Sequence, residues 1–468
     1  WYRVRNCQGI AMKATSRREF LKTSARTFAA ISSGAVLAQP GRAAQRQRDA
    51  ANDKVVVGVI GLGGRGRDLS GGFARRDDTE VAYLCDVDLK RIGDLPDTIA
   101  RAQGGRTPQV VQDMRRIYDD PDVDAVVIAT CDHWHALASI WACQAGKDVY
   151  VEKPPSHNIW ESRKVVEAAR KYERVVQVGS QNRSAPYVYA AAEYIQSGEL
   201  GDASLVKVYN VKPGGPFRVP EDSPSPDGLD YDLYLGPAAS RPFNQAHFHR
   251  GWKMFWDYSG GDLADDGYHQ LDIARLLIGD PVYPNAVNCS GGKLVFNDDR
   301  EVPDAQVLSF EYDNVLVTFE LTQYTQYMQK TPGHIRMGDG FPDWPLNATR
   351  IEVYGSRGLM YLGRHGGGWQ VVTSNGEIKD ELPGRMENEG HRDNFIECVR
   401  SREKPNADIE TGHLSAVMVH LGNIGVRLGG RRLVIDPQTE TLVADAAANA
   451  DTLMRRTYRE PYAVPETV

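Results

Sequence analysis

The sequence predicts an α/β fold of two domains, in which a parallel sheet is followed by a larger, mostly antiparallel open sheet. Residues 51–180 alternate short apolar runs with helical stretches, which is typical of a parallel sheet covered by helices. Between residues 200 and 380, polar and apolar side chains alternate with a period of two, as in antiparallel strands with one solvated face. The length of 468 residues also exceeds the usual size of a single core.

Residues 1–50 have the pattern of an export signal and linker. Arg17 and Arg18 precede Phe-Leu-Lys, a mildly apolar stretch follows at residues 27–38, and small residues lie near Ala43. These features are typical of a twin-arginine signal, and a plain basic amphipathic helix is the alternative. The apolar stretch is too short to span a bilayer. We therefore expect export to the periplasm or beyond through the twin-arginine machinery, with no membrane span.

Charge and cysteine usage argue against several classes of protein. The net charge of −7 hides an asymmetry, because residues 1–50 carry ten basic and two acidic residues, which leaves 45 basic against 60 acidic residues elsewhere. A remainder with a net charge of −15 does not favour a nucleic-acid partner. The six cysteines form no Cys-x-x-Cys pair and show no metal-ligand spacing with histidines, so we interpret them as buried small side chains.

The first strand of the parallel sheet, at residues 55–60, leads into a loop with the spacing Gly-x-Gly-x-x-Gly. In a dinucleotide-binding Rossmann domain, Gly61 permits the tight turn and Gly63 lets the backbone approach a pyrophosphate. Gly66 lets the following helix lie close to the strand. The loop therefore predicts a nicotinamide dinucleotide bound in residues 51–180.

The end of the second strand indicates which dinucleotide is bound. Asp86 follows an apolar run and lies 20 residues after Gly66, where a carboxylate accepts hydrogen bonds from the ribose hydroxyls. A carboxylate there would repel a 2′-phosphate, which favours NAD. Arg65 and Arg67 weaken this preference, so NADP stays an alternative.

Two later strands of the first domain end in candidate functional residues. The remaining strands of this domain are expected at 110–112, 123–129, 149–151 and 175–179, with a helix at 159–172. Thr130 and His135 follow one strand, and Glu152 and Lys153 follow the next, at the sheet edge where open α/β folds bind ligands. His135 has a plain alternative, which is that it starts a helix capped by Asp132. Lys153 precedes two prolines, and its peptide bond to Pro154 could be cis.

The second domain, residues 181–468, is expected to carry the substrate site. Its predicted strands include 204–209, 306–312 and 315–320, and helices are expected at 262–278, 390–400 and 412–428. Two proline-rich loops, 213–228 and 332–345, are too long for simple connections and are expected to border the site.

The helix expected at 262–278 combines carboxylates with an imidazole. Its spacing places Asp265, His269 and Asp272 on one face, so Asp265 could orient His269 as a base for a hydroxyl proton. A structural ion pair is one alternative. A metal site of Asp265, His269 and either His135 or His247 is another, but nothing fixes a ligand triad, and we expect no metal.

These motifs resemble those of the glucose-fructose oxidoreductase / inositol dehydrogenase (Gfo/Idh/MocA) family. The resemblance rests on Gly61 to Gly66, Glu152-Lys153-Pro154 and Asp265-x-Gly267-x-His269-x-x-Asp272, in this order, and covers residues 54–462. Residues 176–183, 229–237 and 255–261 are similar to the exported bacterial branch. Two features depart from the family pattern, namely Cys131 in place of a proline, and Tyr231 and Tyr234 where tryptophans are frequent.

The resemblance implies an NAD(P)-dependent oxidoreductase that acts on a sugar or polyol and forms a homodimer or homotetramer. In such enzymes the residues that match Lys153, Asp265 and His269 line the active site, with the histidine as the base. We expect the cofactor to contact Gly61, Gly63, Gly64, Arg65, Gly66, Asp86, Thr130, His135, Glu152, Lys153 and Gln181. Because free cofactor is not expected outside the cytoplasm, an exported enzyme should bind it tightly and recycle it within each turnover.

Two other functions stay open. The family also contains NAD-dependent glycoside hydrolases, in which the sugar is transiently oxidised, the aglycone is eliminated and the sugar is reduced again. In that case Tyr187, Tyr189, Tyr258 or Tyr268 could serve as an extra acid or base. A catalytically inactive sugar-binding protein is the third hypothesis, against which the presence of all three candidate catalytic residues argues.

Overall fold

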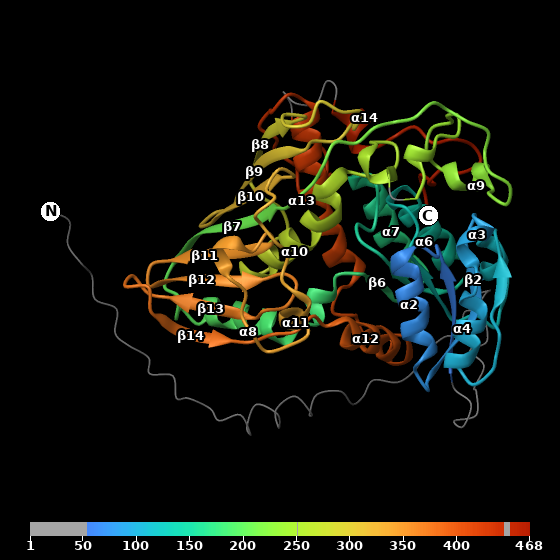
Figure 1. Cartoon of the computed structure of the whole chain (residues 1–468), viewed down its shortest axis with the longest axis horizontal. Coiled ribbons are helices and arrows are strands. Elements are labelled where there is room, and N and C mark those ends of the chain that lie inside the picture. Colours follow the sequence, from blue (N-terminus) through green and yellow to red (C-terminus); the bar gives the residue numbers. More distant parts are fainter. Residues whose placement is uncertain (1–53, 250, 444–449) are drawn as a thin grey trace, which may run out of the picture. The chain divides into compact units, whose positions relative to one another are not determined.

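The computed structural model describes residues 54–249, 251–443 and 450–468, which form one compact unit with two sheets (Figure 1). The expected export signal lies outside the described residues. Within the described ranges, no helix is both long and apolar enough to cross a membrane. The two sheets confirm the predicted fold class, with a parallel sheet first and a mostly antiparallel one second.

The first sheet has six parallel strands in the order β3-β2-β1-β4-β5-β6. The central strands β1 and β4 are almost entirely buried, because helices cover both faces of the sheet. The strands are β1 (Val55–Ile60), β2 (Thr79–Cys85), β3 (Gln109–Val111), β4 (Ala125–Ile128), β5 (Asp148–Val151) and β6 (Val176–Val178).

Most helices of this layer connect consecutive strands of the first sheet. They are α2 (Gly64–Ala74), α3 (Leu89–Ile92), α4 (Leu95–Ala102), α5 (Arg115–Tyr118), α6 (Asp132–Gln144) and α7 (Ile159–Lys171). A further helix, α12 (Asn388–Ser401), comes from near the end of the chain and lies beside α2 (Figure 1). Its Phe395 packs edge to face against Phe73 and Tyr150, so a C-terminal segment completes the core of the first sheet.

The second sheet has eight strands in the order β14-β13-β12-β11-β7-β10-β9-β8. All neighbouring strands are antiparallel except β7 and β10, which are parallel. The strands are β7 (Ala203–Val211), β8 (Ala286–Gly292), β9 (Ala305–Glu311), β10 (Leu316–Thr322), β11 (Arg350–Gly355), β12 (Gly358–Gly363), β13 (Trp369–Val372) and β14 (Ile378–Leu382).

Helices α10 (Tyr268–Leu277) and α13 (Ile409–Arg427) lie between the two sheets (Figure 1). Helix α13 contacts β8 and β9 of the second sheet and also β6 and α7 of the first layer. A Cβ atom at Gly412 would lie 2.4 Å from Cγ2 of Val178, so only glycine permits this approach of α13 to β6. The remaining helices of this part are η1 (Gln181–Ser184), α8 (Pro186–Gln196), α11 (Gly333–Arg336) and the short α14 (Asp451–Met454).

A long segment between β7 and α10 forms a small aromatic cluster of its own. It contains α9 (Tyr231–Leu235) and the 3-10 turns η2 (Gln245–His247) and η3 (Gly251–Met254). Tyr234 packs against Phe248 with ring centroids 4.9 Å apart. Nε1 of Trp134 in α6 donates to the carbonyl oxygen of Leu233 over 2.9 Å, which anchors the segment to the first layer.

Candidate functional site

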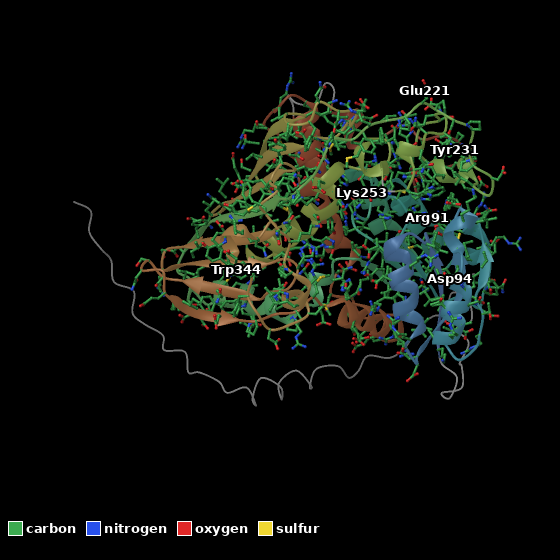
Figure 2. The ribbon with its side chains drawn as sticks, viewed as in Figure 1. Arg91, Asp94, Glu221, Tyr231, Lys253 and Trp344 are labelled. Carbon is green, nitrogen blue, oxygen red and sulfur yellow. The ribbon has the colours of Figure 1, made fainter. Side chains whose placement is uncertain are left out.

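A cavity of about 700 Å³ extends from the glycine-rich loop after β1 to helix α10. The predicted site residues line it with the exception of Gly66, namely Gly61, Gly63, Gly64, Arg65, Asp86, Thr130, His135, Glu152, Lys153, Gln181, Asp265 and His269. Arg91 and Lys253, labelled in Figure 2, line it as well. The prediction that the two proline-rich loops border the site is wrong, because no residue of 213–228 or 332–345 lines the cavity. Phe248, His249 and Trp252, from the segment before α10, line it instead.

The glycine-rich loop has the geometry that a pyrophosphate requires. Gly61 has a φ of +86°, and a Cβ atom there would lie 2.6 Å from the carbonyl oxygen of Ala129. A Cβ atom at Gly66 would lie only 1.8 Å from the carbonyl oxygen of Gly61. Helix α2 has no side-chain cap at Gly63 and no acidic residue in its first turn, so its N–H groups are available to an anion.

Asp86 fixes this loop to the end of β2. Its carboxylate accepts hydrogen bonds from the backbone N–H groups of Leu62, at 2.7 Å, and Asp88, at 2.9 Å. Burial raises the pKa of Asp86 against the opposing effect of these hydrogen bonds. Beside it, Nε of Arg91 donates to Nδ1 of His249 over 2.6 Å. Sequence reasoning missed this pair, since His249 comes from a loop 158 residues away.

Arg65, in the glycine-rich loop, and Arg67, just after it, already form hydrogen bonds with other groups of the protein. Nε of Arg65 donates to Glu152 over 2.7 Å, and its Nη1 donates to Asp68 over 2.6 Å. Arg67 donates to the backbone carbonyls of Arg91 and Ile92. Burial alone would raise the pKa of Glu152, but the charge and hydrogen bond of Arg65, together with the charge of Lys153, lower that pKa.

His135 and Thr130 tie the ends of two strands together. The two ring nitrogens of His135 lie 2.6 Å from the carbonyl oxygen of Pro154 and 3.2 Å from that of Thr130. Burial lowers the pKa of His135, and in its neutral form the ring can donate to only one of these two carbonyls. Gln181 reaches the same region and donates to the hydroxyl of Tyr150 over 3.2 Å. These contacts position the backbone of Lys153 and Pro154, whose connecting peptide bond is cis.

Lys153 and Asp265 form an ion pair in the cavity. Nζ of Lys153 lies 2.5 Å from Oδ1 of Asp265 and 2.9 Å from its carbonyl oxygen. Lys253, from the segment before α10, also donates to this carboxylate. Burial would raise the pKa of Asp265, but the two lysines outweigh it and hold the pKa well below its usual range. Asp265 is therefore ionised and holds Lys153 in place.

The helix expected at 262–278 is interrupted, and the expected role of Asp265 as orienter of His269 is wrong because its carboxylate pairs with two lysines. Residues Leu263–Gly267 form a π-helical turn, η4, before α10 begins at Tyr268. Asp265 and His269 both line the cavity, but the carboxylate of Asp265 binds Lys153 and Lys253 and, among the described residues, makes no hydrogen bond to His269. Asp272 is absent from the cavity, because it is buried against Arg183 at 2.8 Å.

His269 lines the inner end of the cavity. Within the described part of the chain, its Nδ1 is buried and has no hydrogen-bond partner. Burial, together with the positive charges of Arg364 and Lys153, holds the pKa of His269 well below its usual range. A neutral imidazole with an unused nitrogen can accept a proton from a hydroxyl group.

Asp132 is a cavity residue that sequence reasoning treated only as a helix cap. Its carboxylate accepts a hydrogen bond of 2.6 Å from Ser259, and burial raises its pKa to about 7. Its position directly after β4 was the available signal. By contrast, Tyr187, Tyr189, Tyr258 and Tyr268 do not line the cavity, and the hydroxyls of Tyr187, Tyr189 and Tyr268 donate to backbone carbonyls.

No group of three potential metal ligands occurs among the described residues. His247 packs edge to face on Phe255 and does not line the cavity, so it does not join Asp265 and His269. The five cysteines within the described ranges are free thiols.

The glycine-rich loop on a parallel sheet, with a cavity that continues to a lysine, a carboxylate and a histidine, defines a dinucleotide-binding α/β protein. Comparison with known families makes this specific. Residues 55–180 match the Gfo/Idh/MocA oxidoreductase family model for an NAD-binding Rossmann fold. Residues 217–300 and 361–464 match the same family's model for a C-terminal alpha/beta domain. The chain belongs to the Gfo/Idh/MocA oxidoreductase family.

Individual relatives are distant. The uncharacterized oxidoreductase YrbE of Bacillus subtilis is 24% identical over 56% of this chain, and the match spans 64% of YrbE. The myo-inositol 2-dehydrogenase of Thermotoga maritima is 22% identical over 80% of this chain and 93% of its own. The crystal structure of aldose-aldose oxidoreductase from Caulobacter crescentus, complexed with glycerol, shares the fold with a TM-score of 0.59, at 18% identity over 82% of this chain and all of the other.

Proposed function

We propose that this protein is an NAD-dependent oxidoreductase that transfers a hydride between its cofactor and a secondary alcohol of a sugar, polyol or sugar derivative. One observation carries the proposal: a single cavity connects the glycine-rich loop to Lys153 and His269. The names of similar proteins support this class of reaction, since they include a myo-inositol 2-dehydrogenase and an aldose-aldose oxidoreductase.

Lys153 and His269 have different roles in the proposed alcohol oxidation. When bound, the nicotinamide ring supplies the hydride acceptor or donor. Lys153, held by Asp265, donates a hydrogen bond to the reacting oxygen and stabilises the negative charge that develops there. His269 takes the hydroxyl proton as the carbon loses its hydride, and it returns that proton in the reverse reaction.

The choice of NAD over NADP is supported by the surroundings of Asp86. The carboxylate lies in the cavity where a 2′-phosphate would have to bind. Arg65 and Arg67, which could compensate for it, are engaged by Glu152, Asp68 and two backbone carbonyls. Neither arginine offers a free guanidinium to a phosphate.

We further propose that the cofactor stays bound and that the protein is exported. The support is the twin-arginine pattern at Arg17 and Arg18, since this route carries folded and loaded proteins. Full-length protein purified from an exported fraction and then denatured should release close to one NAD(H) per chain. An empty protein would contradict the bound cofactor, and an R17K/R18K double variant that is still exported would contradict the signal.

A homodimer or homotetramer is proposed from the family resemblance. Light scattering of the purified protein after size-exclusion chromatography measures its mass directly. A monomer at micromolar concentration would contradict this proposal without affecting the proposed chemistry.

NAD-dependent glycoside hydrolysis is the second candidate, and Asp132 favours it. A carboxyl group whose burial raises its pKa to about 7 is suited to proton transfer during elimination and re-addition. The assay that separates the candidates follows both absorbance at 340 nm and aglycone release. Cleavage of aryl glycosides without net cofactor reduction would contradict the oxidoreductase, whereas reduction by a free sugar without cleavage would contradict the glycosidase. A sugar-binding protein without activity would show neither.

A further inference from the structure

Positive charges outnumber negative ones around the turn that precedes α10, where Lys153, Lys253 and Arg364 line the cavity and two further lysines lie outside its lining. Five cationic side chains gather around three carboxylates of the turn that precedes α10. The cations are Lys153, Lys212, Lys253, Lys330 and Arg364, and the carboxylates are Asp262, Asp265 and Asp266. Asp132, the other carboxyl group near these lysines, is hydrogen-bonded to Ser259 and does not remove the excess.

Arg364 is the cation whose ion pair is the longest of the group. It follows β12, lines the cavity, and its side chain is only 8% exposed. Its nearest carboxylate oxygen, on Asp266, is 3.9 Å away, and the other oxygen of that carboxylate is taken by Lys212 and Lys330. Among the described residues, its Nε has no hydrogen-bond partner. A buried guanidinium without hydrogen bonds is costly unless a ligand supplies an anion.

The backbone on both sides of Arg364 is fixed. The carbonyl oxygen of Arg364 accepts a hydrogen bond from Asn182 at 2.8 Å, and that of Gly363 accepts one from the hydroxyl of Tyr187 at 2.6 Å. The guanidinium therefore belongs to a rigid part of the wall rather than to a mobile loop. Arg364 follows β12 of the second sheet and lies near Asp266 of the turn before α10, whereas the glycine-rich loop that receives the pyrophosphate belongs to the first sheet.

We propose that Arg364 is a specificity residue that binds a carboxylate of the substrate, so that the preferred carbohydrate is a sugar acid. The planar guanidinium matches a carboxylate with two parallel hydrogen bonds. The excess positive charge of the surrounding lysines favours an anionic over a neutral sugar. This inference rests on the proposed function, because it assigns the substrate class of the same cavity.

The test uses the NAD-loaded full-length protein and matched sugars. Calorimetry compares glucuronate, galacturonate and mannuronate with glucose, galactose and mannose, and includes the three hexose 6-phosphates. At least one uronate should bind about tenfold or more tightly than its neutral counterpart. Equal binding of acids and neutral sugars throughout the panel would overturn the proposal, and so would tightest binding of a phosphate.

Variants identify the residue. R364Q should abolish the preference for the acid while leaving NAD affinity unchanged, and R364K should retain part of it. R350Q is the matched control, because Arg350 lies on β11 and pairs with Glu352 outside the cavity. Survival of the preference in R364Q, or an equal loss in R350Q, would overturn the assignment. If R364Q does not fold, R364K and the wild-type comparison still decide it.

The binding readout separates this inference from the proposed function. Selective binding of an acid without any change at 340 nm would keep the carboxylate site and remove the oxidoreductase. Reduction of the cofactor by neutral sugars, with no preference for acids, would do the reverse.

Discussion

The protonation of His269 determines the pH range over which this site can oxidise an alcohol. Burial and the charges of Arg364 and Lys153 depress its pKa well below the usual range near 6.5. A base acts in its neutral form, so activity is lost only as pH falls through this lowered pKa. Between pH 6.5 and 8 the imidazole is therefore already in its active form.

We expect kcat/KM for carbohydrate oxidation to be flat across neutral pH, with its acid limb well below pH 6.5. An acid limb at or above pH 6.5 in the wild-type protein would contradict His269 as the base. H269N should lower kcat by about 10²- to 10⁴-fold and remove this limb.

K153M tests the role of the lysine. It removes one hydrogen bond to the reacting oxygen and should lower kcat by about 10²- to 10³-fold. Loss of its charge should also move the acid limb of the profile upwards, because Lys153 is one of the groups that depress the pKa of His269. K379M on β14 is the control, since Lys379 is distant from the cavity lining and pairs with Glu199. A K153M profile that matches wild type would contradict the assignment.

At the scale of elements, the glycine-rich loop depends on one close approach between Gly66 and Gly61. In G66A the new Cβ atom would lie 1.8 Å from the Gly61 carbonyl oxygen, so the loop must move by more than 1 Å. A displacement of that size should weaken NAD binding by roughly 10²-fold. G71A, on the same helix, meets only the flexible end of Arg75 and should bind NAD normally. Calorimetric titration of NAD measures both, and equal affinities would contradict the loop geometry.

The sequence predicts the first sheet and its strand ends well, because buried parallel strands have a strong local signal. Lys153, predicted at the end of a strand, and Asp265 and His269, predicted on one helix, line the same cavity as expected. The pairing of Asp265 with Lys153 rather than His269 was not predictable, because the two residues are 112 positions apart and only the tertiary fold brings them together. Arg364 was also missed, because only the tertiary fold brings β12 to α10.

On the scale of the whole molecule, histidines make stability depend on pH. In ten of the eleven histidines the pKa is lowered, with burial as the main cause. For His133 it falls to about 3 and for His391 to about 4. The unfolded chain then binds more protons than the folded protein below pH 6.5, so acid destabilises the fold. Asp132 and Asp86, whose pKa values are raised by burial, act in the opposite direction but are two groups against ten histidines.

We expect the free energy of unfolding to fall as pH decreases from 6.5 towards 4. Each fully buried histidine contributes at most about 1.4 kcal/mol per pH unit. Urea denaturation between pH 7.5 and 5 measures the slope. H391Q should reduce it, whereas H334Q should not, because His334 lies outside the buried set. A stability that is constant or rises on acidification would contradict the neutral, buried histidines.

The central claim is that one cavity joins a bound NAD to a base that accepts a hydroxyl proton from a carbohydrate. Rapid mixing of the NAD⁺-loaded protein with sugars and sugar acids, followed at 340 nm, tests it most directly. The account predicts a single-turnover rise of about one reduced cofactor per chain with at least one carbohydrate, and a rise slowed about 10²-fold or more in H269N. No rise with any carbohydrate, or an equally fast rise in H269N, would contradict it.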